Sequence, residues 1–456
     1  MEIGSTRSGA ACPRRLSPRR PPATPDPART LRGRLERSKD RVTYSSPETP
    51  KAVGGRPRRT VGVVIAVAVV VIAAAVVSVL VVNRSSNKQA NPTTQTTIPG
   101  GAAAPAVGSV IHGIYVNADV GKPIPASVLS APSVDGVVLR FYWKTLEPNQ
   151  GQFDFSALDQ DIASVTAAGK KYSLAVTVGN YTPGWVATAG AHVLAFTVSP
   201  HRGNGNCRAV DIPVPWDPVY LKELDGMISA VGAHITGDAA RFAAMTQVKV
   251  TGIGEYTDET RMPLENPTQS KGGCPLTDAL SVWMANGYRP SLVEQAWNHM
   301  LDSWAAAFPG RSLGNNFINQ SFPDIGENGQ TSKGAGSALT NKLIDDGLAR
   351  YRSRFAVQTQ ALQAISGTTA FVQDAGRRGA TIGYQLAENL FGNPSCAGVQ
   401  QVNNVVKAAC DPNSLAQALQ LGQSSGAAYI EVFPLTVSAY PPQLESGHTA
   451  LDARAG

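Results

Sequence analysis

The pattern of hydrophobic and polar positions divides the 456-residue chain into one long apolar segment and a later series of shorter apolar runs. Val61 to Val82 is a run of 22 residues without a charge. At about 1.5 Å per residue, a helix of this length spans the roughly 30 Å hydrocarbon core of a bilayer. We therefore predict a single transmembrane helix at 61–82.

Beyond residue 110, runs of strand length alternate with stretches of helical period. The segment 139–178 has the pattern of a strand, a turn, an amphipathic helix and a second strand. Its helix begins after Ser156 and places Leu158, Ile162 and Val165 on one face. This succession predicts a βαβ unit with parallel strands.

The same pattern continues to the end of the chain and predicts one large α/β domain over 110–456. Further strands are expected at 110–117, 134–143, 248–253, 311–319, 369–374, 381–387 and 427–434, and helices at 216–228, 292–306, 339–365 and 414–421. No period of 20–50 residues recurs, which argues against a solenoid.

Two carboxylates follow the strand predicted at 248–253. The chain passes Gly252 and Gly254 and then places Glu255 and Glu259 within five residues. In an α/β barrel, the carboxyl end of a strand is where a general acid or base is delivered. A strand that runs into a polar surface loop has the same pattern, so both interpretations stay open.

A third carboxylate, Glu431, lies inside an otherwise apolar strand. Tyr429, Glu431 and Phe433 share one face of that strand, opposite Ile430 and Val432. A charge in such a strand is costly unless it is paired or solvated in a cleft. Glu431 is therefore the least surface-like carboxylate of the chain.

A signature follows the second predicted strand. It reads W…EP..G.(F/Y)DFS.LD and comprises Arg140, Trp143, Glu147, Pro148, Gly151, Phe153, Asp154, Phe155, Ser156, Leu158 and Asp159. Over about 40 residues the chain thus resembles the retaining glycoside hydrolases of the (β/α)8-barrel type, in particular their β-galactosidase-like branch. The resemblance implies a TIM barrel, an acid/base Glu just past the fourth strand and a nucleophile on the seventh.

The sequence departs from that family pattern at two places. Gly254 stands before Glu255, where the family usually has Asn, so Glu259 is a competing acid/base. The strand count places Glu388 at the end of the seventh strand and Glu431 on the eighth. The catalytic candidates are therefore Glu255, Glu259, Glu431 and Glu388.

Six other residues are candidates for substrate binding: Arg140, Trp143, Trp185, Tyr256, Asp374 and Tyr429. The resemblance implies that Arg140 positions or charges the nucleophile. Trp143 and Trp185 are of the kind that stacks on sugar rings, and a core role is equally open for them. Asp374 either ends the sixth predicted strand or caps the turn after it.

Charge is distributed unevenly along the chain. Residues 1–60 carry 15 Lys and Arg against 5 Asp and Glu, while the remainder has a net charge of −3. The basic pI thus belongs to the N-terminal tail, and no nucleic-acid partner is expected for the folded domain. The tail is predicted to be disordered and cytoplasmic, since basic residues favour the inner side of a membrane. Residues 83–109 are predicted to be a flexible extracellular stalk before the domain at 110–456.

The cysteines agree with this topology. Cys12 lies in the predicted cytoplasmic tail, while Cys207, Cys274, Cys396 and Cys410 form an even set outside. We expect the pairs Cys207–Cys274 and Cys396–Cys410. No CxxC or His-rich cluster accompanies them, so neither a zinc site nor another cofactor is expected.

These features predict a membrane-anchored extracellular glycosidase that acts on a polysaccharide or cell-envelope glycan. The alternative is a non-catalytic barrel that binds such a glycan. The pattern leaves the oligomeric state open.

Overall fold

A computed structural model describes residues 111–199, 207–269, 274–318, 320–364, 370–387, 401–402, 405–406 and 412–455. The predicted tail, transmembrane helix and stalk lie outside these ranges. Among the described helices, none combines the length and the apolar character that crossing a bilayer requires.

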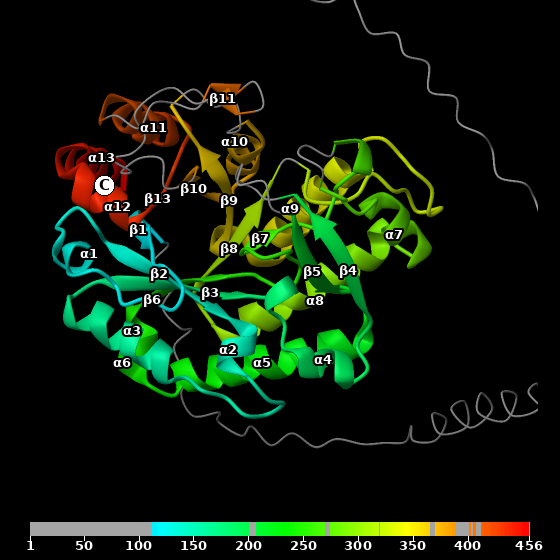
Figure 1. The fold of residues 1–456 in the computed structure, drawn as a ribbon. Helices are drawn as coiled ribbons and strands as arrows, with labels where there is room; N and C mark the ends of the chain where they lie inside the picture. The colour runs from blue at the N-terminus through cyan, green and yellow to red at the C-terminus, as the bar shows by residue number, and fades with distance from the viewer. Residues whose placement is uncertain are drawn as a thin grey trace, which may run out of the picture. The chain divides into compact units, whose positions relative to one another are not determined.

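Eight parallel strands form a closed barrel (Figure 1). In chain order they are β1 (Gly113–Asn117), β2 (Gly136–Tyr142), β3 (Lys171–Thr177), β6 (Met245–Lys249), β8 (Ser312–Phe317), β9 (Phe355–Leu362), β10 (Thr381–Leu386) and β13 (Tyr429–Val432). Each strand pairs with the next, and β13 pairs with β1 to close the ring. The predicted (β/α)8 barrel is confirmed.

Helices lie around the barrel, most of them between successive strands, while the last two follow the final strand (Figure 1). They are α1 (Ala126–Ser130), α2 (Trp143–Leu146), α3 (Ser156–Ala167), α4 (Gly184–Thr188), α5 (Pro218–Thr236), α6 (Ala239–Ala244), α7 (Ala279–Ala285), α8 (Pro290–Ala307), α9 (Ala335–Tyr351), α10 (Ala370–Arg377), α11 (Pro412–Ser424), α12 (Pro434–Ala439) and α13 (Pro441–Ala455). Helix α3 buries Leu158, Ile162 and Val165, as its spacing predicts. Helix α8 likewise buries Trp297 and Trp304 in the core.

The sixth strand is a correction to the sequence analysis. Residues 339–365 were expected to be largely helical, but α9 ends at Tyr351 and β9 follows. Residues 369–374, predicted as the strand, lie instead largely in α10. The helix ends where Arg352 adopts a positive φ of 48°. Strand β9 carries Gln358 in its middle, and this polar residue interrupts the apolar run that marks a buried strand.

The fourth strand is also shifted. It was expected at 248–253, whereas β6 covers Met245–Lys249, and residues 250–253 already belong to the loop that follows. The strand therefore ends on a lysine that the prediction had placed in its interior.

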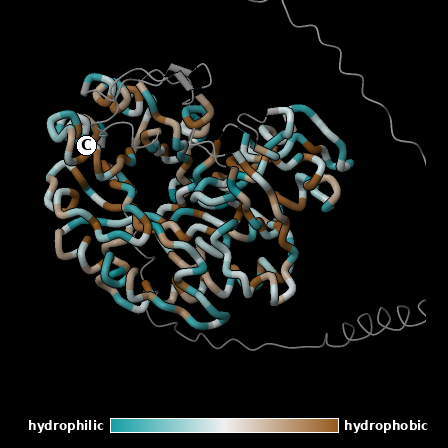
Figure 2. The backbone as a smooth tube through the Cα atoms, viewed as in Figure 1, coloured by the Kyte–Doolittle hydropathy of each residue, from teal (hydrophilic) through white to brown (hydrophobic). Residues whose placement is uncertain are grey.

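The interior of the barrel is unusually polar. Tyr115, Gln247, Lys249, Gln358, Tyr429 and Glu431 are all at most 1 % exposed. Such interiors are more often filled by branched aliphatic residues. Hydrophobic and hydrophilic positions are accordingly interspersed along the strands in Figure 2.

Glycines make room for these large side chains. A Cβ at Gly136 would lie 2.3 Å from the Tyr115 ring, and one at Gly383 would lie 2.1 Å from the Tyr429 ring. The two rings themselves meet edge to face, with their centroids 6.4 Å apart. A side chain at either glycine would therefore collide with an interior tyrosine.

A hairpin of β4 (Val193–Val198) and β5 (Arg208–Pro213) is inserted after β3. The disulfide Cys207–Cys274 joins its second strand to the segment before α7, with the Cα atoms 5.6 Å apart. This predicted pair is confirmed. Cys396 and Cys410 lie outside the described residues, as does Cys12. The short hairpin of β11 (Gln401–Val402) and β12 (Val405–Val406) precedes α11.

Candidate functional site

The loop after β6 extends over the carboxyl ends of four neighbouring strands. The backbone N–H of Asn180, just after β3, donates to the carbonyl of Glu255 at 2.8 Å. Further along, β7 (Glu259–Thr260) pairs with β8. The strands β3, β6, β8 and β9 are consecutive in the barrel. The acidic residues of this loop therefore gather at the carboxyl ends of the barrel strands, where such barrels carry their active sites.

Glu255 is a buried carboxyl group. Its residue is 3 % exposed, and Arg261 Nε lies 3.1 Å from Oε1. Burial raises the pKa of Glu255 to about 8, since desolvation outweighs the opposing charge of Arg261. At neutral pH the group is therefore largely protonated, which suits it to donate a proton.

The remaining acids of the loop lie close by. Burial raises the pKa of Glu259 to about 7, again against the charge of Arg261. Arg261 also lies 4.0 Å from the Glu265 carboxylate. One guanidinium is thus shared among three carboxyl groups, and its charge does not offset the desolvation that raises the pKa of Glu255 and Glu259.

Asp258 is an acid that the sequence analysis did not select. Its two oxygens accept hydrogen bonds from Asn316 Nδ2 at 2.6 Å and from Gln360 Nε2 at 3.0 Å. Asn316 is on β8 and Gln360 on β9, so Asp258 ties the loop to two strand ends.

Glu431 occupies a closed polar network inside the barrel. Its carboxylate accepts hydrogen bonds from Lys249 Nζ, from Gln358 Nε2 at 2.7 Å and from Asn117 Nδ2 at 3.4 Å. Lys249 Nζ also donates to Gln358 Oε1 at 2.5 Å. Of the two possibilities that the sequence leaves open, pairing or solvation in a cleft, the structure shows pairing, because Lys249 and Glu431 form an ion pair with neither side chain exposed.

Lys249 remains charged in this setting. Burial acts to lower its pKa, but the Glu431 carboxylate together with Tyr429 and Asp258 offsets that effect, and the pKa is raised. The lysine comes directly from the corrected end of the fourth strand. Glu255 follows six residues after Lys249. The end of the fourth strand therefore supplies the partner of Glu431 and leads into the loop that carries Glu255.

Arg140 contacts the backbone of the first βα loop. Its Nε and Nη2 donate to the Ala118 carbonyl at 3.2 and 3.0 Å. The basic group in direct contact with Glu431 is Lys249, which takes the position that the resemblance implied for Arg140.

Three of the aromatic candidates have different environments. Trp143 is fully buried and donates its indole N–H to Glu147 at 2.8 Å, so it belongs to the core and is inaccessible to a sugar. Trp185 is partly buried and packs edge to face against Trp143. Tyr429 is fully buried and donates its hydroxyl to Gln358 at 2.7 Å inside the barrel. Neither Trp143 nor Tyr429 offers a ring face to a ligand here.

Tyr256 is only half-buried, and the guanidinium of Arg208 lies 4.7 Å from its ring centroid. It follows Glu255 directly, so it borders the candidate acid.

Two candidates that follow the sixth and seventh strands, Asp374 and Glu388, are not at a described strand tip. Asp374 lies on α10, where it pairs with Arg377 at 2.9 Å and with Arg378 at 3.2 Å. The predicted position at a strand end was wrong, because the sixth strand precedes this helix. Glu388 lies outside the described residues, two positions after the end of β10.

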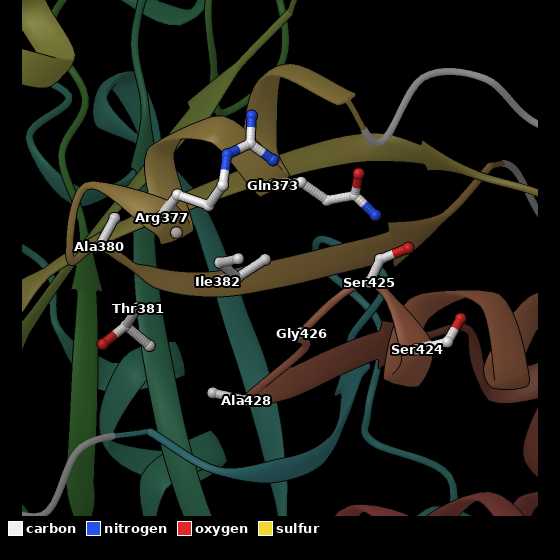
Figure 3. A pocket seen from close by; sticks show the side chains of 10 residues that line it. Gln373, Arg377, Ala380, Thr381, Ile382, Ser424, Ser425, Gly426 and Ala428 are labelled. Carbon is white, nitrogen blue, oxygen red and sulfur yellow. The ribbon is translucent and has the colours of Figure 1, made fainter.

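A shallow depression of about 700 Å³ lies at the other end of the barrel (Figure 3). Its lining includes Thr381 and Ala428, at or before the starts of β10 and β13, and Arg377 of α10. Because barrel enzymes place their chemistry at the carboxyl ends of the strands, this depression is not the candidate site.

Comparison with known proteins adds to this geometry. Residues 132–256 match the family model of the beta-galactosidases of glycoside hydrolase family 42. The match runs from β2 through β6 and includes Glu255. A search of curated proteins found no match.

Among 324 similar chains of solved structure are the following three. The catalytic domain of a β-amylase from Paenibacillus polymyxa is 11 % identical, with a TM-score of 0.49, and the alignment covers 76 % of this chain and 100 % of that one. A β-galactosidase from the psychrophilic Marinomonas ef1 is 13 % identical, with a TM-score of 0.45 and coverage of 75 % and 59 %. The intracellular xylanase TsXylA from Thermoanaerobacterium saccharolyticum is 14 % identical, with a TM-score of 0.39 and coverage of 71 % and 85 %.

The strand pairing shows the fold, and the sequence match shows a similarity to the family over residues 132–256. The chain is therefore similar to the β-galactosidase branch of the (β/α)8-barrel glycoside hydrolases over residues 132–256, as its own signature predicts.

Proposed function

We propose that the protein is a retaining glycosidase whose acid/base is Glu255. The observation that carries the proposal is a buried carboxyl group with a pKa raised to about 8, placed after the fourth barrel strand and inside the family-matched stretch. Glycosidases need one carboxyl that is protonated at the working pH and one that is ionised.

In the first step Glu255 protonates the glycosidic oxygen while a second carboxylate attacks the anomeric carbon. In the second step the Glu255 carboxylate takes a proton from water, which displaces the enzyme carboxylate from the sugar. This mechanism requires the two carboxyl groups to be about 5–5.5 Å apart.

Two residues compete for the role of nucleophile. Glu431 is held next to the ammonium of Lys249, but its carboxylate is closed off by Lys249, Gln358 and Asn117. Glu388 follows the seventh strand, which is where the resemblance places the nucleophile.

A trapping experiment decides between them. We expect a 2-deoxy-2-fluoro glycosyl fluoride to inactivate the enzyme and to leave one labelled glutamate, which peptide mass spectrometry locates. A label on residue 431 or 388 identifies the nucleophile. Turnover of substrate with inversion of configuration and no covalent adduct would contradict the retaining mechanism.

The second candidate function is a barrel that binds glycan without cleaving it. The complete pairing of Glu431 with interior groups favours it, because a sugar reaches that carboxylate only if the network opens. Glycan binding without hydrolysis across a panel of aryl glycosides and envelope polysaccharides would support this second function.

We further propose that residues 61–82 anchor the protein in the cell membrane, with residues 1–60 cytoplasmic and the barrel outside. The uncharged run of 22 residues supports this topology. The full chain should stay in the membrane fraction after alkaline carbonate washing, while a variant without residues 61–82 should be released. Release of the full chain by the wash would contradict the anchor.

A further inference from the structure

Three basic side chains gather near the carboxyl ends of β2 and β3. Arg140 is on β2, Lys144 on α2 directly after it, and Arg208 on the inserted strand β5. Lys144 Nζ lies 4.9 Å from the ring centroid of Tyr181. Arg140 shares a face of β2 with Tyr142, and the charges of Arg140 and Arg208 oppose the burial that raises the pKa of the Tyr142 hydroxyl. The three cations thus lie near one pair of tyrosines.

The tyrosines form a stacked pair. Tyr142 ends β2, and Tyr181 ends a short turn after β3. Their ring centroids are 3.7 Å apart and their planes differ by 13°. Both side chains are half-buried, so the pair is a rigid aromatic surface at the end of the barrel that carries Glu255.

Arg208 connects this surface to the candidate acid. On β5, Val210 and Ile212 are buried, and Arg208 shares their face because side chains alternate along a strand. Arg208 itself is exposed at the start of the strand, and its guanidinium lies over the ring of Tyr256, the residue after Glu255.

None of the three cations is matched by a carboxylate within the described ranges. Arg140 donates to a backbone carbonyl, and Lys144 and Arg208 lie over aromatic rings. The neighbouring acids are occupied elsewhere, since Glu255 and Glu265 pair with Arg261. Positive charge without a carboxylate partner beside an aromatic surface fits an anionic ligand with a ring.

We propose that Arg140, Lys144 and Arg208 form a subsite for an anionic sugar residue, a uronate or a sulfated sugar, next to the acid/base. This inference rests on the proposed function and assigns its substrate class: an acidic polysaccharide. The Tyr142–Tyr181 pair packs against the ring, and the three cations bind its carboxylate or sulfate.

The test compares three polymers of related backbone by affinity electrophoresis and calorimetry: neutral galactan, polygalacturonate and a sulfated galactan. The full chain is used with the substitution Glu255→Gln, which keeps the polymers intact. Arg208→Gln and Lys144→Gln are added in turn. The matched control is Lys222→Gln on α5, whose side chain is 78 % exposed. The basic tail is the same in every variant, so its contribution cancels when variants are compared on the same polymer, and that comparison locates the binding at the barrel.

We expect one acidic polymer to bind at least tenfold more tightly than galactan and to lose affinity as ionic strength rises. Arg208→Gln and Lys144→Gln should each weaken that binding by about tenfold, the value of one hydrogen bond to a charged group. Lys222→Gln should change it little. Binding of polygalacturonate would identify a carboxylate as the preferred anionic group, and binding of the sulfated galactan would identify a sulfate.

Equal or tighter binding of galactan would overturn the proposal. So would an equal effect of Arg208→Gln, Lys144→Gln and Lys222→Gln, or a failure of both acidic polymers to bind. The proposed glycosidase function is tested separately, by a hydrolysis assay on the chain that retains Glu255. No hydrolysis in that assay would contradict it. The charge preference is measured by binding and does not depend on that result.

Discussion

Glu255→Gln should lower kcat/KM on an unactivated glycoside by about 10²–10⁴-fold, because glutamine cannot transfer a proton to the leaving oxygen. With an aryl glycoside whose phenol is a good leaving group, the first step needs little acid assistance. The loss of rate in that step should then be much smaller. Steady-state and burst kinetics on both substrate types measure the difference.

The same residue should set the alkaline limb of the pH profile. Burial raises the pKa of Glu255 to about 8, so the proton needed for catalysis is present below that pH and is lost as the pH rises through it. Activity should therefore fall above about pH 8 in the wild type. The Glu255→Gln variant should lack that limb.

Two variants make this outcome specific. Glu445→Gln changes an exposed glutamate on α13 and should leave the kinetics unchanged. Glu259→Gln tests the neighbouring acid. If Glu259→Gln abolished proton transfer while Glu255→Gln retained it, the acid/base role would belong to Glu259.

The second large effect concerns stability. Lys249→Met removes the ammonium that pairs with Glu431 and leaves a carboxylate buried without a counter-charge. Loss of one partner of a buried ion pair typically costs about 3–5 kcal/mol. We expect a decrease of that size in the free energy of unfolding of the full chain, measured by urea denaturation at neutral pH.

A double variant separates the lost charge from lost packing. Lys249→Met with Glu431→Gln leaves no charge in the network, so its destabilisation should be clearly smaller than the sum of the two single effects. Additive effects would show that the pair contributes no coupling. Lys122→Gln serves as a control for an exposed ion pair, because the side chains of Lys122 and Asp119 are 71 % and 45 % exposed, and it should change the stability little.

The sequence alone determined the parts of this protein that depend on local periodicity. The βαβ unit at 139–178, helices α3 and α8 and the seventh strand follow from spacings of two or of three to four, which need no distant partner. Cys207–Cys274 was also expected, because these two cysteines lie in the insertions that flank the strand leading to Glu255. Glu431 could be selected because a charge in an apolar strand is costly wherever that strand lies.

Only the tertiary structure decided what surrounds those residues. Strand β9 was missed because its polar Gln358 faces an interior filled with Lys249, Tyr429 and Glu431, and no local pattern announces a polar barrel core. Lys249 acquired its role from a strand far away in sequence, since Glu431 lies 182 positions later. Trp143, a candidate for sugar stacking, became core because Glu147 and Trp185 enclose it. Whether a side chain is buried or faces a ligand depends on its neighbours across the barrel, and those are set by strand pairing between distant segments.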